Sequence, residues 1–382
     1  MFRKKQRSKY FAMGIILVLI FSLTLTGCAS PATPSPPPAA PAAPAAPGAA
    51  PEAAELEPVH LSMFIWAGAN QGVVPKEIVE AFLLENPHVT IEFHETNNAT
   101  IYPMMVAARE ATPDDPLVNM GFFNQATISR GEFDGMWISL DPEVIPNMHL
   151  IDEGFWRPGN RGIGFVDTPS GLLYNVNAAP RSPTSWADLW SDDFAGRVTL
   201  WDYNWFAPVM AARINGGSEF DMEPGWALWE ERAGNLHSLF TSNDQMKNLL
   251  ISGDAWIAPF FSSLSTVWIE DEGAPLGWVA PQEGAIAHAA YLAIVEGSSP
   301  AQIAVAKELI NILLEPEWNA RYAELTNNVP LARGAMELLP PGHFDRPGLT
   351  GDFDMIHFDW DYMAQHDSDW RSIWDRRIKA NM

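Results

Sequence analysis

The sequence predicts an α/β fold, because strand-like and helix-like segments alternate along most of the chain. Residues 59–66 are almost continuously apolar, which is typical of a strand buried on both faces. Residues 75–86 then place their apolar side chains on one helical stripe. Residues 89–95 alternate apolar and polar side chains, as a half-buried strand does. A strand, a helix and a strand at this spacing form a βαβ unit, so we expect parallel strands.

The same alternation continues towards the C-terminus. Ser185 and Asp188 are spaced as a helix capping box. An amphipathic helix is expected at 300–316, and short strands are expected at 197–201, 254–258 and 277–280. About 320 residues follow position 58, which is enough for two lobes of ordinary domain size.

The N-terminus predicts export and a lipid anchor. Five basic residues precede the apolar stretch 11–26, which has about the length of a signal peptide and is short for a membrane span. Cys28 is the only cysteine of the chain, and the order Leu25-Thr26-Gly27-Cys28 resembles a bacterial lipobox. That resemblance implies a signal peptide at 1–27 and a lipidated Cys28, with an uncleaved N-terminal anchor as the alternative. In both cases the remaining chain is extracytoplasmic and held at the cell membrane, in the periplasm or on the outer face.

Residues 28–58 are expected to form a tether, because this Ala/Pro-rich stretch cannot bury enough apolar surface to offset the entropy of ordering. The net charge of −24 argues against nucleic acid as a partner and against electrostatic attraction to anionic lipids. A single cysteine excludes intramolecular disulfides.

A ligand cleft is expected where the predicted strands end. In open parallel sheets, ligands bind beyond the carboxyl ends of the strands. The segments that follow the expected strands are rich in aromatic and polar side chains: WAGANQG (66–72), FFNQ (122–125), WDYNW (201–205), PFFSS (259–263) and PQEG (281–284). Aromatic walls with a few polar groups are typical of small-molecule sites, although the same rings could pack a core between two lobes.

Three longer motifs carry a family resemblance: SGLLYNVNAAPRSPTSWADLWSDDFAGRVTLWD (170–202), MKNLLISGDAWIAPF (246–260) and WVAPQEGAIAHAAYLAIV (278–295). In this order they resemble the polyamine- and iron-type substrate-binding subunits of ATP-driven bacterial importers. The resemblance implies a two-lobed, type II periplasmic-binding-protein-like fold, with a ligand cleft between lobes joined by hinge strands. It implies a first lobe at 59–169 and 290–329 and a second lobe at 170–289 and 330–382. It also implies a monomer that closes on its solute and delivers it to an ABC permease.

The resemblance bears on the solute as well. Polyamine binders of this family hold the ligand with an aromatic box and with carboxylates that pair with its ammonium groups. Trp66 and Asp202 stand where the family places such groups, but Phe206, His288 and Ala290 stand where it has further aromatic or acidic partners. Two expected ammonium partners are therefore missing, although Asp202, Glu283 or Glu95 could supply a carboxylate.

We predict a small-molecule solute, an amine or polyamine-like cation such as putrescine or spermidine, with ferric iron, thiamine and aminophosphonate as alternatives. An anionic solute could use Arg157 or Arg161. No cofactor, metal or catalytic residue is expected, since no nucleophile elbow, zinc motif or phosphate loop is present. A surface-tethered hydrolase and a cell-wall polymer-binding protein are the rival functions. The predicted ligand-binding residues are Trp66, Asn70, Phe123, Asn124, Tyr174, Asp202, Tyr203, Trp205, Phe260, Glu283 and His288.

Overall fold

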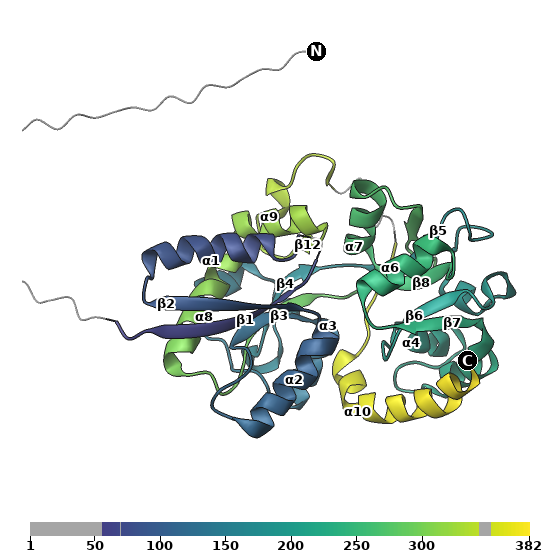
Figure 1. The fold of residues 1–382 in the computed structure, drawn as a ribbon, viewed down its shortest axis with the longest axis horizontal. Helices are drawn as coiled ribbons and strands as arrows, with labels where there is room; N and C mark the ends of the chain where they lie inside the picture. Colours follow the sequence, from purple (N-terminus) through teal and green to yellow (C-terminus); the bar gives the residue numbers. More distant parts are fainter. Residues whose placement is uncertain (1–55, 69, 344–352) are drawn as a thin grey trace, which may run out of the picture. The chain divides into compact units, whose positions relative to one another are not determined.

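The computed structural model describes residues 56–68, 70–343 and 353–382 (Figure 1). The predicted signal peptide, Cys28 and most of the predicted tether lie outside the described residues. Within the described ranges, no helix is both long and apolar enough to cross a membrane.

The first sheet has six strands in the order β12-β4-β11-β3-β1-β2. Strand β1 (Val59–Trp66) pairs in parallel with β2 (Val89–Thr96) and β3 (Met120–Asn124). The predicted parallel βαβ unit is thereby confirmed, with helix α1 (Val73–Glu85) between β1 and β2. Three antiparallel strands complete the sheet: β4 (Ile163–Asp167), β11 (Ala290–Ile294) and β12 (Val329–Pro330).

Helices cover both faces of this sheet. One core joins the sheet to α1, α8 (Pro300–Leu313) and α9 (Pro316–Thr326), and it contains fully buried side chains such as Leu309 and Tyr322. A second core lies on the opposite face, against α2 (Asn98–Ala111) and α3 (Gln125–Phe133). Burying one large aliphatic side chain stabilises a fold by about 1.5–3 kcal/mol, so these two cores hold the strand ends in place.

The second sheet follows the order β13-β10-β5-β8-β6-β7, with β9 (Leu276–Val279) paired to β5. Its remaining strands are β5 (Ser170–Asn175), β6 (Val198–Trp201), β7 (Leu236–Phe240), β8 (Ile257–Phe261), β10 (Ala285–Ile286) and β13 (Met355–Ile356). The strand expected at 254–258 corresponds to β8, which begins three residues later than predicted. The predicted capping box is present: Ser185 and Asp188 cap the short 3₁₀ helix Trp186–Trp190.

The helices of the second sheet pack around tryptophan side chains. They are α4 (Phe206–Ile214), α5 (Glu223–Glu231), α6 (Asn243–Ser252), α7 (Ser262–Thr266) and α10 (Trp360–Ile373). Trp205 lies 5.6 Å from Trp370 and 6.0 Å from Trp226, measured between ring centroids, in edge-on geometry. Such edge-to-face pairs add about 0.5–1.5 kcal/mol beyond the area that they bury.

The two sheets belong to one compact unit, Leu56–Met382. The chain passes from β4 of the first sheet to β5 of the second through Thr168 and Pro169, and it returns from β10 to β11 through residues 287–289. Helix α10, which contributes to the core of the second sheet, also packs against α3 of the first. There Arg130 Nη1 lies 2.5 Å from Asp367 Oδ2.

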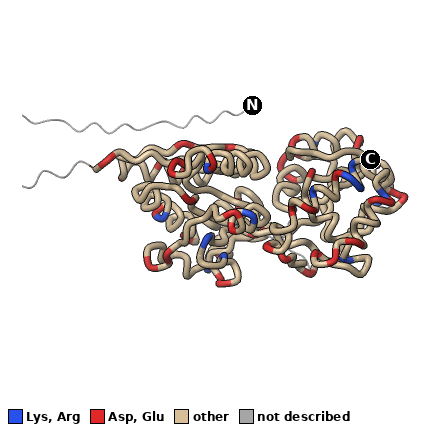
Figure 2. The backbone as a smooth tube through the Cα atoms, turned by 90° about the horizontal axis from the view of Figure 1, so that it is seen from below, with Lys and Arg blue, Asp and Glu red and all other residues tan. Residues whose placement is uncertain are grey.

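Acidic residues are spread over both halves of the described chain, as Figure 2 shows. Several of them pair with arginines; Glu77, for example, accepts two hydrogen bonds from Arg321 at 2.8 Å. This wide distribution agrees with the excess of acidic residues in the sequence.

Candidate ligand-binding site

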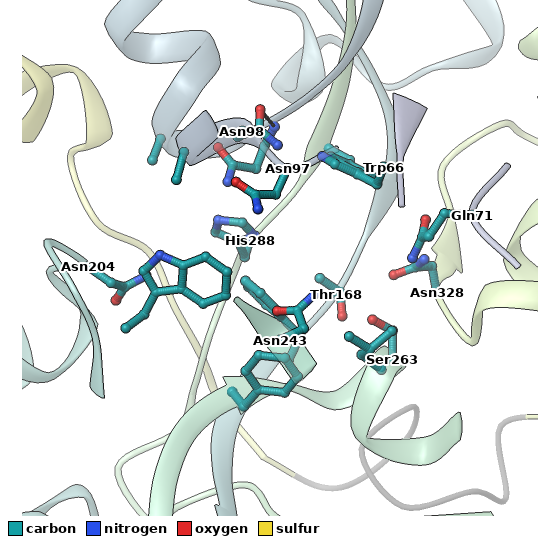
Figure 3. A pocket seen from close by; sticks show the side chains of 18 of the residues that line it. Trp66, Gln71, Asn97, Asn98, Thr168, Asn204, Asn243, Ser263, His288 and Asn328 are labelled. Atoms are coloured by element: carbon teal, nitrogen blue, oxygen red, sulfur yellow. Dashed lines mark hydrogen bonds between the residues drawn. The ribbon is translucent and has the colours of Figure 1, made fainter. Parts of the chain in front are cut away.

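A cavity of about 190 Å³ lies where strands of both sheets end (Figure 3). The ends of β1, β2 and β3 line it from the first sheet, and the ends of β6 and β8 line it from the second. Four of the five segments that the strand-end rule singled out contribute to the lining; the fifth, 281–284, does not. The volume is below the range of about 300–1,000 Å³ for drug-sized pockets, so it suits a small solute.

Aromatic rings form much of the wall. Trp66 comes from the first sheet, and Phe206 and Phe261 come from the second. His288 packs between the last two, with its ring centroid 5.5 Å from that of Phe206 and 4.9 Å from that of Phe261. In the view of Figure 3, His288 lies between Asn97, which follows β2 of the first sheet, and Asn243, which follows β7 of the second. A flat or apolar face of a solute can therefore lie against these rings.

His288 is the one titratable side chain among the described residues that line the cavity. It is only 4% exposed, and burial lowers its pKa to about 3. The imidazole is therefore neutral near pH 7. Among the described residues, the ring hydrogen-bonds only the backbone of His288 itself, so one ring nitrogen remains able to bind a solute.

Asparagine side chains supply most of the polar lining. Asn97 and Asn124 are the N-caps of α2 and α3, and each Oδ1 accepts a hydrogen bond at 2.9 Å from a backbone N–H three residues further on. Asn204 Oδ1 accepts at 2.9 Å from the backbone N–H of Phe206, at the start of α4. N-cap asparagines are common because their oxygen satisfies an N–H that the helix leaves unpaired. The local helix starts therefore orient these amides.

The charged residues near the crossings line a different cavity, of about 720 Å³. Arg157 belongs to it and pairs with Glu132 at 2.7 Å and Asp361 at 2.5 Å. Asp167 also lines it, and burial raises the pKa of this carboxyl group. Arg157, which the sequence offered as a partner for an anionic solute, is thus occupied by carboxylates and lies outside the first cavity.

Residues 115–366, about two thirds of the chain, match the family model described as bacterial extracellular solute-binding protein. The chain belongs to this family. The family resemblance predicted from the sequence motifs is confirmed.

Known relatives of this solute-binding protein agree with the assignment. The spermidine/putrescine-binding periplasmic protein of Escherichia coli is 24% identical over 277 residues, which cover 70% of this chain and 77% of that protein. The crystal structure of the spermidine/putrescine ABC transporter substrate-binding protein of Streptococcus pneumoniae has a TM-score of 0.62 at 18% identity, covering 83% of this chain and 99% of that one. The periplasmic binding protein AfuA of Actinobacillus pleuropneumoniae, solved with fructose-6-phosphate, has a TM-score of 0.66 at 16% identity, covering 84% and 99%. These likenesses confirm the predicted two-lobed, type II fold.

Four of the predicted ligand-binding residues of this solute-binding protein line the cavity: Trp66, Asn124, Phe260 and His288. The other seven lie elsewhere. Asn70 donates a hydrogen bond to Leu325 O at 3.2 Å. Phe123 and Trp205 are buried core side chains.

The remaining predicted residues are engaged with other protein groups. Tyr174 hydrogen-bonds Ser182 at 2.8 Å. Asp202 pairs with Lys379 at 2.9 Å, and the ring of Tyr203 lies 3.9 Å from the same ammonium group. Glu283 accepts hydrogen bonds from the hydroxyl of Ser185 and from the backbone N–H of Trp186, at the start of a 3₁₀ helix. Other groups of the protein thus occupy these polar side chains, and those that bind Asp202, Tyr203 and Glu283 lie far away in the sequence.

The sequence reasoning missed several lining residues. Asn97 and Asn98 follow β2, and Asn243 follows β7, so the strand-end rule could have found all three. Thr168 lies at the crossing from β4 to β5 and gave no signal of its own. Asn328 lies just beyond the end of α9, where no strand end marks it.

Proposed function

We propose that this chain captures a small solute in the cavity between its two sheets and delivers it to the permease of an ABC importer. The observation that carries the proposal is the set of residues that line the cavity. Strand ends of both sheets contribute to it, and so do Thr168 and His288 from two of the segments that connect the sheets. A solute bound there contacts both halves at once, so binding favours the conformation in which they approach each other. We propose that the chain binds and releases its solute without chemistry.

Two lobes would follow the two sheets. The first lobe would comprise 59–169 and 290–339, since Ala332, Ala335 and Leu339 pack with the core of the first sheet. The second would comprise 170–289 and 353–382, with its own strands and core. The C-terminal limit of the first lobe would thus lie about ten residues beyond the predicted 329.

We also propose that a lipid at Cys28 and the Ala/Pro-rich segment hold the binding protein, as a monomer, at the outer side of the membrane. A Cys28→Ser variant should leave the membrane fraction, whereas the unaltered chain should stay in it. Membrane retention of the variant would favour an uncleaved anchor.

Two of the relatives are named for binding spermidine and putrescine, which would suggest a polyamine as the solute of this chain. The sequence also predicted an amine. Ring faces contribute about 0.5–2 kcal/mol each to binding a cation. The carboxylates that would complete such a site are absent from the described lining.

The proposed function is tested by asking which small molecule the protein holds. The full-length chain is purified in detergent and denatured, and the released molecules are identified by mass spectrometry. The identified molecule is then titrated back by calorimetry. Trp66→Ala should weaken its binding at least tenfold, about 1.4 kcal/mol, because the ring lines the cavity.

The matched control is Phe133→Ala, since Phe133 is 66% exposed and lies outside the cavity. Equal loss of affinity in both variants would contradict a site at Trp66. If no small molecule binds, the hydrolase and polymer-binding alternatives become the better explanations, and turnover or binding to insoluble wall polymer would separate them.

A further inference from the structure

We propose that the cavity selects a solute without net positive charge that presents several hydrogen-bond acceptor oxygens beside a ring or apolar face. A sugar or a sugar phosphate has this chemistry. The inference rests on the proposed function, because it names the class of solute for the same cavity. Three features of the lining carry it.

The first feature is the lack of charge. No Asp, Glu, Lys or Arg occurs among the described residues that line the cavity, and its single histidine is neutral near pH 7. An ammonium group that leaves water needs a carboxylate or several acceptors to replace its hydration. A polyamine would bring at least two such groups into this cavity.

The carboxylates that could have met an ammonium group are engaged elsewhere. Asp202 pairs with Lys379, and Glu95 accepts a hydrogen bond from Lys76 at 2.6 Å. Glu283 caps a 3₁₀ helix. All three lie outside the cavity lining, so an amine would have to break existing pairs to reach them.

The second feature is the orientation of the amides. A backbone N–H can only donate, so it identifies the oxygen end of the amide that accepts from it. The backbone N–H groups that bond Asn97, Asn124 and Asn204 therefore leave the three NH₂ groups as the ends available to a solute. Asn98, only 7% exposed, follows the same pattern: its Oδ1 accepts from the backbone of Asn124 at 3.4 Å.

Gln71 extends this set of donors, because its Oε1 accepts a hydrogen bond from the hydroxyl of Tyr322. Among the described residues, none of these five NH₂ groups has a hydrogen-bond partner. Figure 3 shows Asn97 and Asn98 on one side of the hollow, with Gln71 next to Asn328. NH₂ groups donate only, so together they favour a solute with acceptor oxygens.

The third feature is the direction of the helices. Helices α2, α3 and α4 all begin at the cavity, and none carries an acidic residue in its first turn. The first N–H groups of a helix lack partners within the helix, and the aligned peptide dipoles give that end a partial positive charge. These ends attract acceptor oxygens or an anion and disfavour an ammonium ion.

The test compares four probes by the thermal unfolding of the full-length chain in detergent: fructose, fructose 6-phosphate, putrescine and spermidine. We expect a saturable rise in the unfolding midpoint with a sugar or its phosphate and none with the amines. A response to fructose alone indicates a neutral solute, whereas a response to the phosphate alone indicates an anion. A saturable response to either amine overturns the inference and leaves the proposed function intact.

If none of the four probes binds, the protein is exposed to a bacterial extract, and the retained molecules are identified by mass spectrometry. An oxygen-rich molecule without net positive charge supports the inference, and a cation overturns it. Retention of no small molecule at all overturns the proposed function, and the inference falls with it.

A substitution at an N-cap tests the amide argument directly. Asn124→Asp keeps an oxygen that can cap α3 and replaces the NH₂ donor by a carboxylate oxygen. It should weaken the acceptor-rich solute at least tenfold. If Asn124→Asp does not fold, Asn97→Asp serves as the test variant in its place. Ser299→Asp is the matched control, since it adds the same charge at the exposed N-cap of α8, outside the cavity; unchanged affinity in Asn124→Asp overturns the inference.

Discussion

Replacement of Asp367 by alanine is expected to destabilise the protein by about 2–4 kcal/mol. Asp367 lies on α10 and is only 7% exposed. Its carboxylate accepts hydrogen bonds from Trp205 Nε1 at 2.9 Å, from Arg130 Nη1 at 2.5 Å and from Arg371 Nε at 2.7 Å. Because Arg130 belongs to α3, this side chain connects helices of the two sheets.

The magnitude follows from the surroundings of each partner. The indole N–H of Trp205 is buried, and leaving such a donor without a partner costs about 1–3 kcal/mol. The side chains of Arg130 and Arg371 are 40% and 41% exposed, so water replaces much of what they lose. Each of these ion pairs therefore contributes no more than about 1 kcal/mol.

Urea unfolding of the full-length chain measures the loss. Asp367→Asn should cost less than Asp367→Ala, because an amide oxygen can still accept from Trp205. In a Trp205→Phe background, Asp367→Ala should cost about 1 kcal/mol less than in the unaltered chain, since no indole donor is left unpaired. A change below about 0.5 kcal/mol for Asp367→Ala, or equal losses for the alanine and asparagine variants, would refute the reasoning.

Two further predictions concern His288 and Gly131. The pKa of His288 is lowered to about 3 in the folded chain and is about 6.5 when unfolded, so the unfolded state binds a proton first as the pH falls. Stability should therefore drop from pH 6.5 towards 3 by up to about 1.4 kcal/mol per pH unit, and His288→Gln should flatten this slope in urea titrations; parallel slopes would contradict the assignment. A Cβ on Gly131 would lie 2.1 Å from Cζ2 of the buried Trp137. Gly131→Ala should thus lower the free energy of unfolding by more than about 2 kcal/mol. Gly234→Ala should not, because a Cβ there has no heavy atom within 4 Å. Equal thermal midpoints for the two variants would contradict this prediction.

Local sequence patterns predicted much of the fold. Strands β1 and β2 and helix α1 lie within a few residues of their expected positions, because apolar periodicity reports directly which faces are buried. Strand β8 was placed three residues too early. It contains Pro259, which lacks an N–H and argues against a strand interior in any reading of the sequence. Antiparallel pairing of β8 with β5 decided its actual position.

The predicted ligand-binding residues coincide only in part with the lining of the candidate cavity. The direction of the chain decides which end of a strand is its carboxyl end. The expectation that ligands bind beyond these ends therefore pointed to segments that line the cavity. It could not tell that Trp205 faces the core of the second sheet or that Asp202 pairs with Lys379, 177 residues away in the chain. A partly buried carboxylate needs a cationic or N–H partner, and only folding decides which partner comes near.

The sequence by itself therefore determined the α/β alternation, the parallel βαβ unit and the loops from which a ligand site is built. The tertiary structure alone decided which charged groups stay out of that site. It paired Asp202 with Lys379 and Glu283 with a helix start 97 residues away in the chain. The oxygens of Asn97, Asn124 and Asn204, in contrast, bond backbone N–H groups two or three residues further along the chain, so local helix starts orient these amides. The cavity lining is uncharged because Asp202 and Glu283, which lie near it in the sequence pattern, are held elsewhere by partners that no local pattern encodes.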